Sequence, residues 1–313
     1  MSKTSIEWTD FTWNPVSGCT KISPGCKNCY AERYAMRKLG KFSADHQVWS
    51  IRNGGNARDR EFGDVREHPE ELGKTTELKK PHKIFVGSIT DIFHDNVSKQ
   101  FLDWILSEVL INKKHIYQVL TKRTKRMQQY FTDKSIPGGN VIPNLWLGTS
   151  VEDQKFADIR IPYLLVTPAA VRWLSIEPLL DDIQLEPLIW KYVSQKQPYN
   201  EALNWVVVGG ESGPGARPMN LKWVRSLRDQ CKTMGIPFFF KQWGSWIGAE
   251  RVDNDMIRDQ NHNVHYKKQV KFHQFDDQYY AIKLKGKHDA QPMIDGKYYQ
   301  EFPEIANADT KSI

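Results

Sequence analysis

Three of the chain's four cysteines lie close together near its start, in the stretch GCTKISPGCKNCYAER, which begins at Gly18. Cys19, Cys26 and Cys29 are separated by six and then two residues, whereas Cys231 comes much later in the sequence. A disulfide uses two thiols and a closed tetrahedral zinc site uses four ligands, so a set of three needs its own explanation. Thiolates in this number select zinc or an iron–sulfur cluster over hard cations.

Two kinds of metal site use such a set. A structural zinc would take Cys231 or a histidine as its fourth ligand. Cys231, however, lies in the apolar-patterned stretch WVRSLRDQCKTMG, which is typical of a buried structural cysteine. The other kind is a 4Fe–4S cluster held by three cysteines, with one iron open to a small molecule. Pro24 and Gly25 shape a loop whose amides turn toward sulfur, and Lys21 and Lys27 favour the thiolate.

Charged, hydroxyl and glycine residues follow directly after six short β-branched or aromatic runs. In parallel α/β folds the reactive groups gather where the strands end, so these residues are expected on one rim. The structural alternative is a set of solvated loops, with Asp91 and Glu177 in ion pairs with Lys122 or Arg123. In chain order the residues are Ser88, Thr90 and Asp91; Thr121, Lys122 and Arg123; Thr149, Ser150 and Glu152; Glu177; Gly209, Gly210, Glu211 and Ser212; and Lys241 and Gln242.

The stretch GGESG has two interpretations. Gly209 and Gly210 could be plain turn residues. In a functional interpretation they let backbone amides approach a ligand, and Glu211 takes the ligand's ammonium or hydroxyl groups.

The alternation of short apolar runs with longer amphipathic stretches predicts βα units and a parallel sheet. With a first strand at Phe11–Trp13 there are about seven such strands, which predicts a partial or complete parallel (β/α) barrel. The other predicted strands are Ile84–Gly87, Ile116–Leu120, Leu145–Gly148, Val171–Ile176, Trp205–Val208 and Phe238–Phe240. The predicted helices are Tyr30–Leu39, Ser98–Leu110, Lys125–Tyr130, Val151–Leu164 and Leu221–Met234.

Two segments interrupt this rhythm. Residues 41–83 carry nine Lys or Arg against eight Asp or Glu and are interpreted as a charged insertion or lid. Residues 245–313 lose the βα pattern and are interpreted as a small appended unit that covers the barrel. The predicted organisation is therefore a barrel core over 1–244 and a C-terminal segment over 245–313.

The composition excludes two classes of protein. Four cysteines in 313 residues do not make a disulfide scaffold, and no apolar run approaches the ~20 residues needed to cross a bilayer. With a mean hydropathy of −0.60 the chain is expected to be a soluble, cytoplasmic protein without a membrane partner. The formal charge of +7 favours polyanionic partners.

Seven blocks of the sequence resemble one known family, and they cover most of residues 5–244. They are SIEWTDFTWNPVSGCTKISPGCKNCYAER, VGSITDIFH, LTKR, LGTSVED, LSIEPLL, VVVGGESGPGARPM and PFFFKQWG. Together with IDGKYYQEFP near the end of the chain, they resemble the phage Gp37/Gp68-type proteins of the radical S-adenosylmethionine (SAM) superfamily. The first cysteine gap is six residues where that superfamily usually has three, and Asn28 stands in place of the usual aromatic residue.

The resemblance implies a radical SAM-type barrel, a 4Fe–4S cluster on Cys19, Cys26 and Cys29, and SAM chelated to the open iron. One electron from an external donor would cleave a carbon–sulfur bond of SAM and give a 5′-deoxyadenosyl radical that abstracts hydrogen. The implied cofactor-binding residues are Ser88, Thr90, Asp91, Ser150, Gly209, Gly210 and Glu211. The implied catalytic residues, which face the substrate, are Lys122, Glu177, Lys241 and Gln242.

Nucleic acid is the expected substrate. Residues 113–126 contain six Lys or Arg and no acidic residue, and the C-terminal segment mixes aromatic with basic residues. A solvated helix face is the alternative for each stretch. The phage setting of the family suggests a modified DNA base in the host cytoplasm, flipped out of the duplex and rearranged by an isomerase-type reaction.

Three functions remain open on the sequence alone. The first is a radical SAM enzyme that acts on a nucleobase in phage DNA. The second is another radical SAM enzyme, either a repair lyase like the spore photoproduct enzymes or one acting on a small molecule or peptide. The third is a zinc-stapled nucleic-acid-binding module without catalysis.

Overall fold

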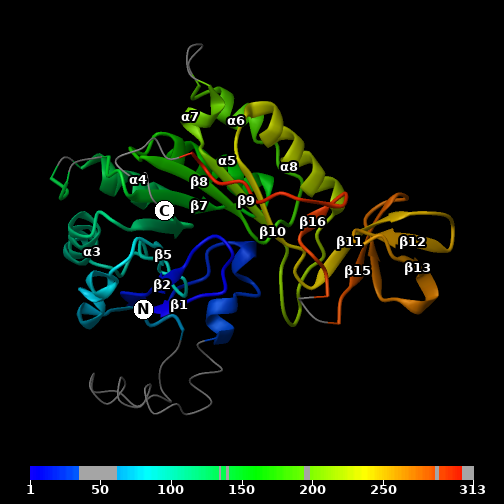
Figure 1. The fold of residues 1–313 in the computed structure, drawn as a ribbon, viewed down its shortest axis with the longest axis horizontal. Coiled ribbons are helices and arrows are strands. Elements are labelled where there is room, and N and C mark those ends of the chain that lie inside the picture. Colours follow the sequence, from blue (N-terminus) through cyan, green and yellow to red (C-terminus); the bar gives the residue numbers. More distant parts are fainter. Residues whose placement is uncertain (35–61, 134, 139–140, 194–197, 286–288, 305–313) are drawn as a thin grey trace. The chain divides into compact units, whose positions relative to one another are not determined.

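The computed structural model describes residues 1–34, 62–133, 135–138, 141–193, 198–285 and 289–304 (Figure 1). The chain divides into two compact units, Met1–Trp146 and Leu147–Ile313. Each unit is built on parallel strands connected by helices, so the predicted α/β class is confirmed.

The first unit is organised around three parallel strands, β2 (Phe11–Trp13), β5 (Lys83–Val86) and β6 (Ile116–Thr121). β5 pairs with β2 on one side and with β6 on the other, whereas β1 (Ser2–Lys3) adds antiparallel to β2. The other elements of this unit are β3 (Val16–Ser17), β4 (Arg66–Glu67), α3 (Lys99–Ile111), α4 (Thr124–Thr132) and the 3-10 turns η1 (Pro24–Cys26), η3 (Pro69–Glu71) and η4 (Lys74–Glu77).

Helix α3 shows why this stretch of sequence is helical. The Ser98 hydroxyl accepts a hydrogen bond from the Phe101 amide at 3.1 Å, which satisfies one amide at the start of the helix. Phe101, Ile105 and Val109 recur every four residues and are all buried. Burying each such side chain contributes about 1.5–3 kcal/mol, so packing of this apolar stripe fixes the helix.

The second unit is also built on parallel strands that are connected by helices. Its parallel strands are β8 (Val171–Ile176), β9 (Trp205–Gly209) and β10 (Phe238–Gln242). The boundary between the two units falls within β7 (Leu145–Ser150), after Trp146. Helix α8 (Leu221–Met234) begins after Asn220, whose side chain accepts from the Lys222 amide, and ends at Gly235 in the left-handed region with φ +67°. The other helices are α5 (Gln154–Leu165), α6 (Glu186–Trp190) and α7 (Tyr199–Ala202).

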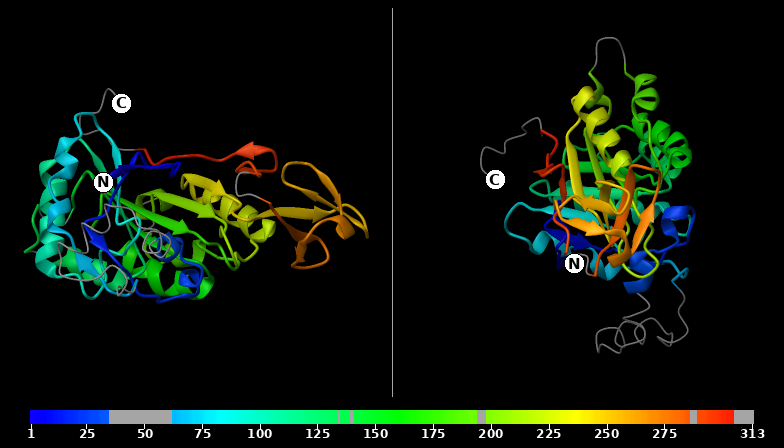
Figure 2. Two further views of the ribbon diagram at one scale, coloured as in Figure 1. Left: turned by 90° about the horizontal axis from the view of Figure 1, so that it is seen from below. Right: turned by 90° about the vertical axis from the view of Figure 1, so that its right-hand side faces the viewer.

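The chain then forms a separate five-stranded antiparallel sheet, coloured yellow to orange in Figures 1 and 2. Its strand order is β13-β12-β11-β15-β14. Trp223 of α8 contacts Phe275 of this sheet with ring centroids 5.3 Å apart, and Arg225 of α8 pairs with Glu250. The strands are β11 (Trp246–Arg251), β12 (Met256–Asp259), β13 (Val264–Tyr266), β14 (Phe272–Gln274) and β15 (Tyr279–Lys283); η5 (Lys267–Gln269), β16 (Met293–Ile294) and β17 (Lys297–Tyr298) complete the unit.

The last described residues cover the outer edge of β10. The Phe240 amide donates to the Tyr299 carbonyl at 2.7 Å, and the Phe238 amide donates to a carboxylate oxygen of Glu301 at 2.9 Å. The indole of Trp205 donates to the Glu301 carbonyl at 2.8 Å. This edge of the sheet is therefore hydrogen-bonded by the C-terminal segment.

The seven predicted strands are all present, and four of the five predicted helices match α3, α4, α5 and α8 to within three residues at each end, α8 without any difference. For the fifth, residues 30–34 are helical and the rest lies outside the described residues. The structure shows parallel sheets, and a closed barrel is not shown, because β1 pairs with β2 and the C-terminal segment pairs with β10. None of the described helices is long and apolar enough to span a membrane.

The predicted domain boundaries stay predictions. Residues 245–313 belong to the second compact unit and contain the antiparallel sheet. Of the predicted insertion at 41–83, residues 41–61 lie outside the described residues. The remainder contains β4, η3, η4 and the first residue of β5.

Candidate functional site

The carboxyl ends of β2, β5 and β6 lie at one edge of the first unit, because the three strands are parallel and in register. The Gly87 amide after β5 donates to the Trp13 carbonyl at the end of β2, at 2.8 Å. The Asn14 side-chain oxygen then accepts from the Ser88 hydroxyl and the Ile89 amide, both at 3.2 Å. The predicted cofactor residue Ser88 is thus fixed against the loop that leads to the cysteines.

The cysteine loop is tied to the same edge at its first residues. Gly18 has φ +85°, and a Cβ there would lie 2.4 Å from the Asp64 carbonyl oxygen, so only glycine fits. Gly18 forms a parallel bridge with Thr90, whose hydroxyl donates to the Gly18 carbonyl. The Cys19 amide donates to the Phe62 carbonyl at 2.9 Å. Thr90 therefore positions the loop backbone.

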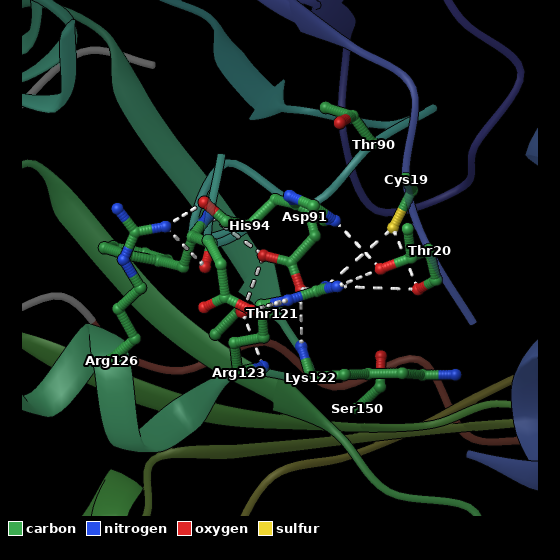
Figure 3. A network of polar contacts seen from close by, with 12 residues as sticks. Cys19, Thr20, Thr90, Asp91, His94, Thr121, Lys122, Arg123, Arg126 and Ser150 are labelled. Atoms are coloured by element: carbon green, nitrogen blue, oxygen red, sulfur yellow. Dashed lines mark hydrogen bonds and ion pairs between the residues drawn. The ribbon is translucent and has the colours of Figure 1, made fainter. Parts of the chain in front are cut away.

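Asp91 is the centre of the polar network (Figure 3). Its Oδ1 accepts from the Phe93 amide at 3.0 Å and from the Thr121 hydroxyl at 2.7 Å. Its Oδ2 accepts from the Lys122 amide and from Nη1 of Arg123, both at 3.1 Å. Asp91 is 6% exposed, so its carboxylate is a buried acceptor that joins the end of β5 to the end of β6.

Arg123 carries this network to the cysteine loop. Its Nη1 lies 3.9 Å from Sγ of Cys19, and its Nη2 donates to the Thr20 hydroxyl oxygen at 2.8 Å. Nε2 of His94 also lies 2.8 Å from that oxygen. The Asn96 amide donates to Nδ1 of His94, which leaves the ring hydrogen on Nε2. Burial and then the charge of Arg123 lower the pKa of His94, so this ring is neutral at pH 7.

Two neighbouring cations contact two different thiols. Nζ of Lys122 lies 3.7 Å from Sγ of Cys26, and Arg123 contacts Cys19. Burial opposes ionisation of Cys26, but the Lys122 charge and hydrogen bonds from Ile22 and Ser23 outweigh it and lower the pKa of this thiol. Burial and then the Asp91 charge raise the pKa of Cys19 to about 11, against the opposing effect of Arg123.

The prediction that Lys21 favours thiolates agrees with its electrostatics, because after Glu32 the charges of Cys29 and Cys26 also raise the pKa of Lys21. Nζ of Lys21 lies 2.7 Å from Glu32, and this partner is the main reason that the pKa of Lys21 is raised. The direct cationic contact to Cys26 comes instead from Lys122. Tyr30, which directly follows Cys29, donates its hydroxyl hydrogen to the Ser88 carbonyl and so ties the end of the loop to the β5 turn.

A second cluster lies at the strand ends of the second unit. Nζ of Lys241 donates to both carboxylate oxygens of Glu177 at 2.9 Å, and Nε2 of Gln242 donates to Oε1 at 3.0 Å. The structure thus brings together three of the four residues predicted to be catalytic. The fourth, Lys122, belongs to the first unit.

The GGESG stretch is largely packed against its own unit. A Cβ on Gly210 would lie 2.1 Å from the Trp243 carbonyl oxygen, and one on Gly209 would lie 3.1 Å from Oε1 of Glu177. Glu211 is 6% exposed and accepts three hydrogen bonds from Arg217, at 2.6–2.9 Å. The two glycines therefore permit close packing, and the carboxylate of Glu211 is held by a neighbouring cation. A cofactor-binding role for these residues stays a prediction.

The strand end after β7 is also buried. Thr149 and Glu152 have no exposed surface, and Ser150 is 6% exposed. Arg160 donates to the Ser150 carbonyl at 2.8 Å and to Glu152 at 2.9 Å. Cofactor binding by Ser150 stays a prediction.

Three cysteines are the candidate ligands for the implied 4Fe–4S cluster. Cys19, Cys26 and Cys29 are free, half-buried and carried on one loop, and two of them contact cations that stabilise thiolates. This donor set fits cluster ligation. Among the described residues, however, no group of three His, Cys, Asp or Glu side chains converges as a ready metal cage. Cys231 is fully buried in α8, and burial raises the pKa of its thiol, as expected for a structural cysteine.

Sequence reasoning missed the residues that position the predicted ones. Thr20 and His94 join Arg123 to the cysteine loop, and Arg126 donates to the Phe93, His94 and Val97 carbonyls. Arg217 holds Glu211. The sequence offered one signal that Thr20 and His94 belong to the site: Thr20 directly follows Cys19, and His94 lies three residues after Asp91.

The chain belongs to the DUF5131 family, described as proteins of unknown function, whose family model matches residues 3–303. This match does not confirm the phage Gp37/Gp68-type family expected from the motifs. No curated protein matches the chain.

Two solved structures are similar to this chain. Both are spore photoproduct lyases with dinucleoside spore photoproduct, one of them a cysteine-to-alanine mutant. The mutant is 10% identical and the other 9%; each match has a TM-score of 0.37 and covers 86% of this chain and 67% of the other. At this TM-score the likeness carries no argument about function.

Replacing Asp91 with Asn should strongly destabilise the first unit. The substitution leaves the buried guanidinium of Arg123 without its carboxylate, which costs about 3–5 kcal/mol. Urea unfolding of the two proteins measures this loss. Asp95→Asn is the matched control, because Asp95 is 81% exposed and 4.0 Å from the same arginine, and its loss should cost at most about 1 kcal/mol. Equal effects of the two substitutions would contradict the role given to Asp91.

Replacing Lys122 with Met should raise the pKa of Cys26. The thiolate would lose the attraction of a cation at 3.7 Å, which is about 1 kcal/mol in water. This loss lowers the ionised fraction of Cys26 about five-fold. Alkylation of Cys26 by iodoacetamide near neutral pH should slow by this factor, as followed by peptide mass spectrometry. Lys125→Met removes an exposed lysine of α4 and should leave the rate unchanged. An unchanged rate in the Lys122 variant would show that the contact does not activate the thiol.

Proposed function

We propose that this protein is an iron–sulfur enzyme of the radical SAM type that acts on a nucleobase in DNA. Cys19, Cys26 and Cys29 would hold the cluster. The observation that carries the proposal is the pair of contacts from the end of β6 to the thiols, Lys122 to Cys26 and Arg123 to Cys19. Three free cysteines on one loop are held beside two cations at a parallel strand end, where α/β enzymes place their chemistry.

These contacts suit bound thiolates better than free thiols. A neutral thiol is a weak hydrogen-bond partner, so it offsets little of the free energy that burying an arginine beside it costs. A thiolate, by contrast, gains directly from a neighbouring cation. Asp91 fixes the direction of Arg123, so the guanidinium is already in place before any ligand binds.

A 4Fe–4S cluster bound with SAM supplies one-electron chemistry that generates a 5′-deoxyadenosyl radical for hydrogen abstraction. Lys241 holds the Glu177 carboxylate from both oxygens, and Gln242 orients it with a third hydrogen bond. This cluster can bind a polar group of the substrate, and it can hold or return a proton at Nζ of Lys241 or at a Glu177 oxygen.

The case for DNA rests on exposed cations. In the basic stretch 113–126, Lys113, Lys114 and Lys125 are exposed, whereas Arg123 and Arg126 are used inside the protein. The stretch is therefore a smaller polyanion-binding surface than its sequence suggested. The finer proposal is that the base is a modified thymine of phage DNA and that the reaction is an isomerase-type rearrangement of its substituent.

Iron binding tests the cofactor proposal. Anaerobic reconstitution with iron and sulfide should give a brown protein with about four iron atoms per chain. Alanine at Cys19, Cys26 or Cys29 should abolish most of this uptake. Cys231→Ala should keep the iron, because this thiol is buried in α8. A colourless protein with one zinc per chain would refute the proposal and favour a zinc-stapled module.

Nucleoside mass spectrometry tests the substrate. DNA carrying modified thymine, incubated with the reconstituted enzyme, SAM and a reductant, should yield an altered nucleoside. Glu177→Gln should keep its iron but slow the reaction by about 100-fold or more, because the proton-holding carboxylate is lost. Glu201→Gln, at an exposed carboxylate, should react normally. A normal rate in the Glu177 variant would remove this residue from the mechanism.

A further inference from the structure

A continuous basic and aromatic segment runs through the small antiparallel sheet. Residues 264–274, VHYKKQVKFHQ, contain three lysines, two histidines and no acidic residue. They form β13, η5 and β14, which are the two edge strands of the sheet and the turn that joins them. Every residue of the segment is exposed or half-buried. The segment therefore offers both edges of one sheet to solvent.

Lysine and aromatic side chains gather around Tyr280 of β15. Nζ of Lys267 donates to the Tyr280 hydroxyl at 3.1 Å and lies 4.6 Å from the centre of its ring. Phe272 contacts the same ring edge-on, with centroids 5.9 Å apart. Lys268 lies 5.8 Å from the centre of the Tyr266 ring. Lys267 and Phe272 thus contact a buried tyrosine. Lys268 lies beside the ring of Tyr266, on the edge strand opposite to that of Phe272.

The aromatic residues of this segment are unusually exposed for their size. Tyr266 is 48% exposed, Phe272 is 36% exposed and the neighbouring Val264 is 47% exposed. Exposed rings beside lysines are the combination that single-stranded nucleic acid requires, because bases stack on the rings and phosphates pair with the ammonium groups.

The lysines of this surface have no carboxylate partner. Lys283 adds to them: its amide donates to the Lys271 carbonyl at 2.8 Å, and burial and then the charge of Lys271 lower its pKa. None of Lys267, Lys268, Lys271 and Lys283 forms an ion pair with a carboxylate of the described residues. Residues 246–283, which form the whole sheet, carry six Lys or Arg against six Asp or Glu, so the excess of positive charge is local to residues 264–274.

The nearby acidic groups are already engaged. Asp259 accepts from His265 at 2.7 Å, and Glu250 is paired with Arg225. Asp276 and Asp253 accept from backbone amides of their own turns at 2.7–2.8 Å. The turn acids accept from their own backbone amides, and among the described residues neither of them forms a direct ion pair with a lysine ammonium group.

We propose that the surface formed by Tyr266, Lys267, Lys268, Lys271 and Phe272 binds single-stranded DNA. This inference rests on the proposed function for its choice of DNA. The exposed rings favour a single strand, because the bases of a duplex are stacked on one another and are not available to a protein ring.

Fluorescence anisotropy with a labelled twenty-nucleotide oligothymidylate tests the surface, using the full chain. Tyr266→Ala should weaken binding roughly ten-fold through the loss of one stacked base. The double variant Lys268→Gln/Lys271→Gln should lower the salt dependence of binding by about 1.4 logarithmic units per ten-fold change in salt. Both substitutions lie at exposed positions, so the urea unfolding midpoint should not change.

Lys222→Gln/Lys232→Gln is the matched control, because it removes the same charge from exposed positions of α8 in the same unit. It should bind oligothymidylate like the unsubstituted protein. An equal loss in the control, an unchanged affinity of the Tyr266 variant, or tighter binding to duplex than to the single strand would each overturn the proposal.

The two proposals fail separately. A chain that takes up iron but does not bind oligothymidylate overturns the DNA-binding surface and leaves the cluster proposal standing. A chain that binds the oligonucleotide through Tyr266 but takes up no iron supports the surface and refutes the radical chemistry.

Discussion

The arrangement of the candidate site depends on one buried carboxylate, that of Asp91. Four hydrogen bonds converge on it, and three come from Thr121, Lys122 and Arg123, which are consecutive in the sequence. A carboxylate that accepts backbone and side-chain donors in this number fixes both the strand end and the arginine that leaves it. The cysteine loop meets the network through Arg123, which contacts Cys19 and Thr20, and through Lys122, which contacts Cys26. Asp91 therefore positions the cysteine loop indirectly. It binds Lys122 and Arg123, and these two residues contact the cysteines.

Burial and the charged residues at the ends of β5 and β6 give two of the thiols different pKa values. Cys26 lies beside Lys122 and has a lowered pKa, whereas Cys19 is near Asp91 and has a pKa of about 11. Thiols of unequal acidity on one loop would ionise, and so accept a metal, one after the other. This order follows from burial, the largest cause of the raised pKa of Cys19, and then from the charges of Asp91 near Cys19 and of Lys122 beside Cys26. It is a property of the fold and not of the cysteine spacing.

Much of the fold could be predicted because its periodic patterns are strong. Helix α8 and strand β8 have the bounds that their sequences predict, since Asn220 and Gly235 mark the helix ends and a continuous apolar run marks the strand. The antiparallel sheet was missed because its strands are only three to six residues long and several are exposed on both faces. In the site, the strand-end rule predicted Glu177 and Lys241, and the structure shows these two residues in contact, while their catalytic role stays a prediction. The rule could not find His94 or Arg217, which reach their partners through loop geometry that no periodicity encodes.

The segment that pairs with the outer edge of β10 comes from the last described residues of the chain. Until Tyr299 and Glu301 have been synthesised, the Phe240 amide lacks its backbone acceptor and the Phe238 amide lacks the Glu301 carboxylate. An uncovered parallel edge is a template for unwanted pairing between chains. A chain shortened before Tyr299 would therefore leave the edge of β10 open to pairing with other chains.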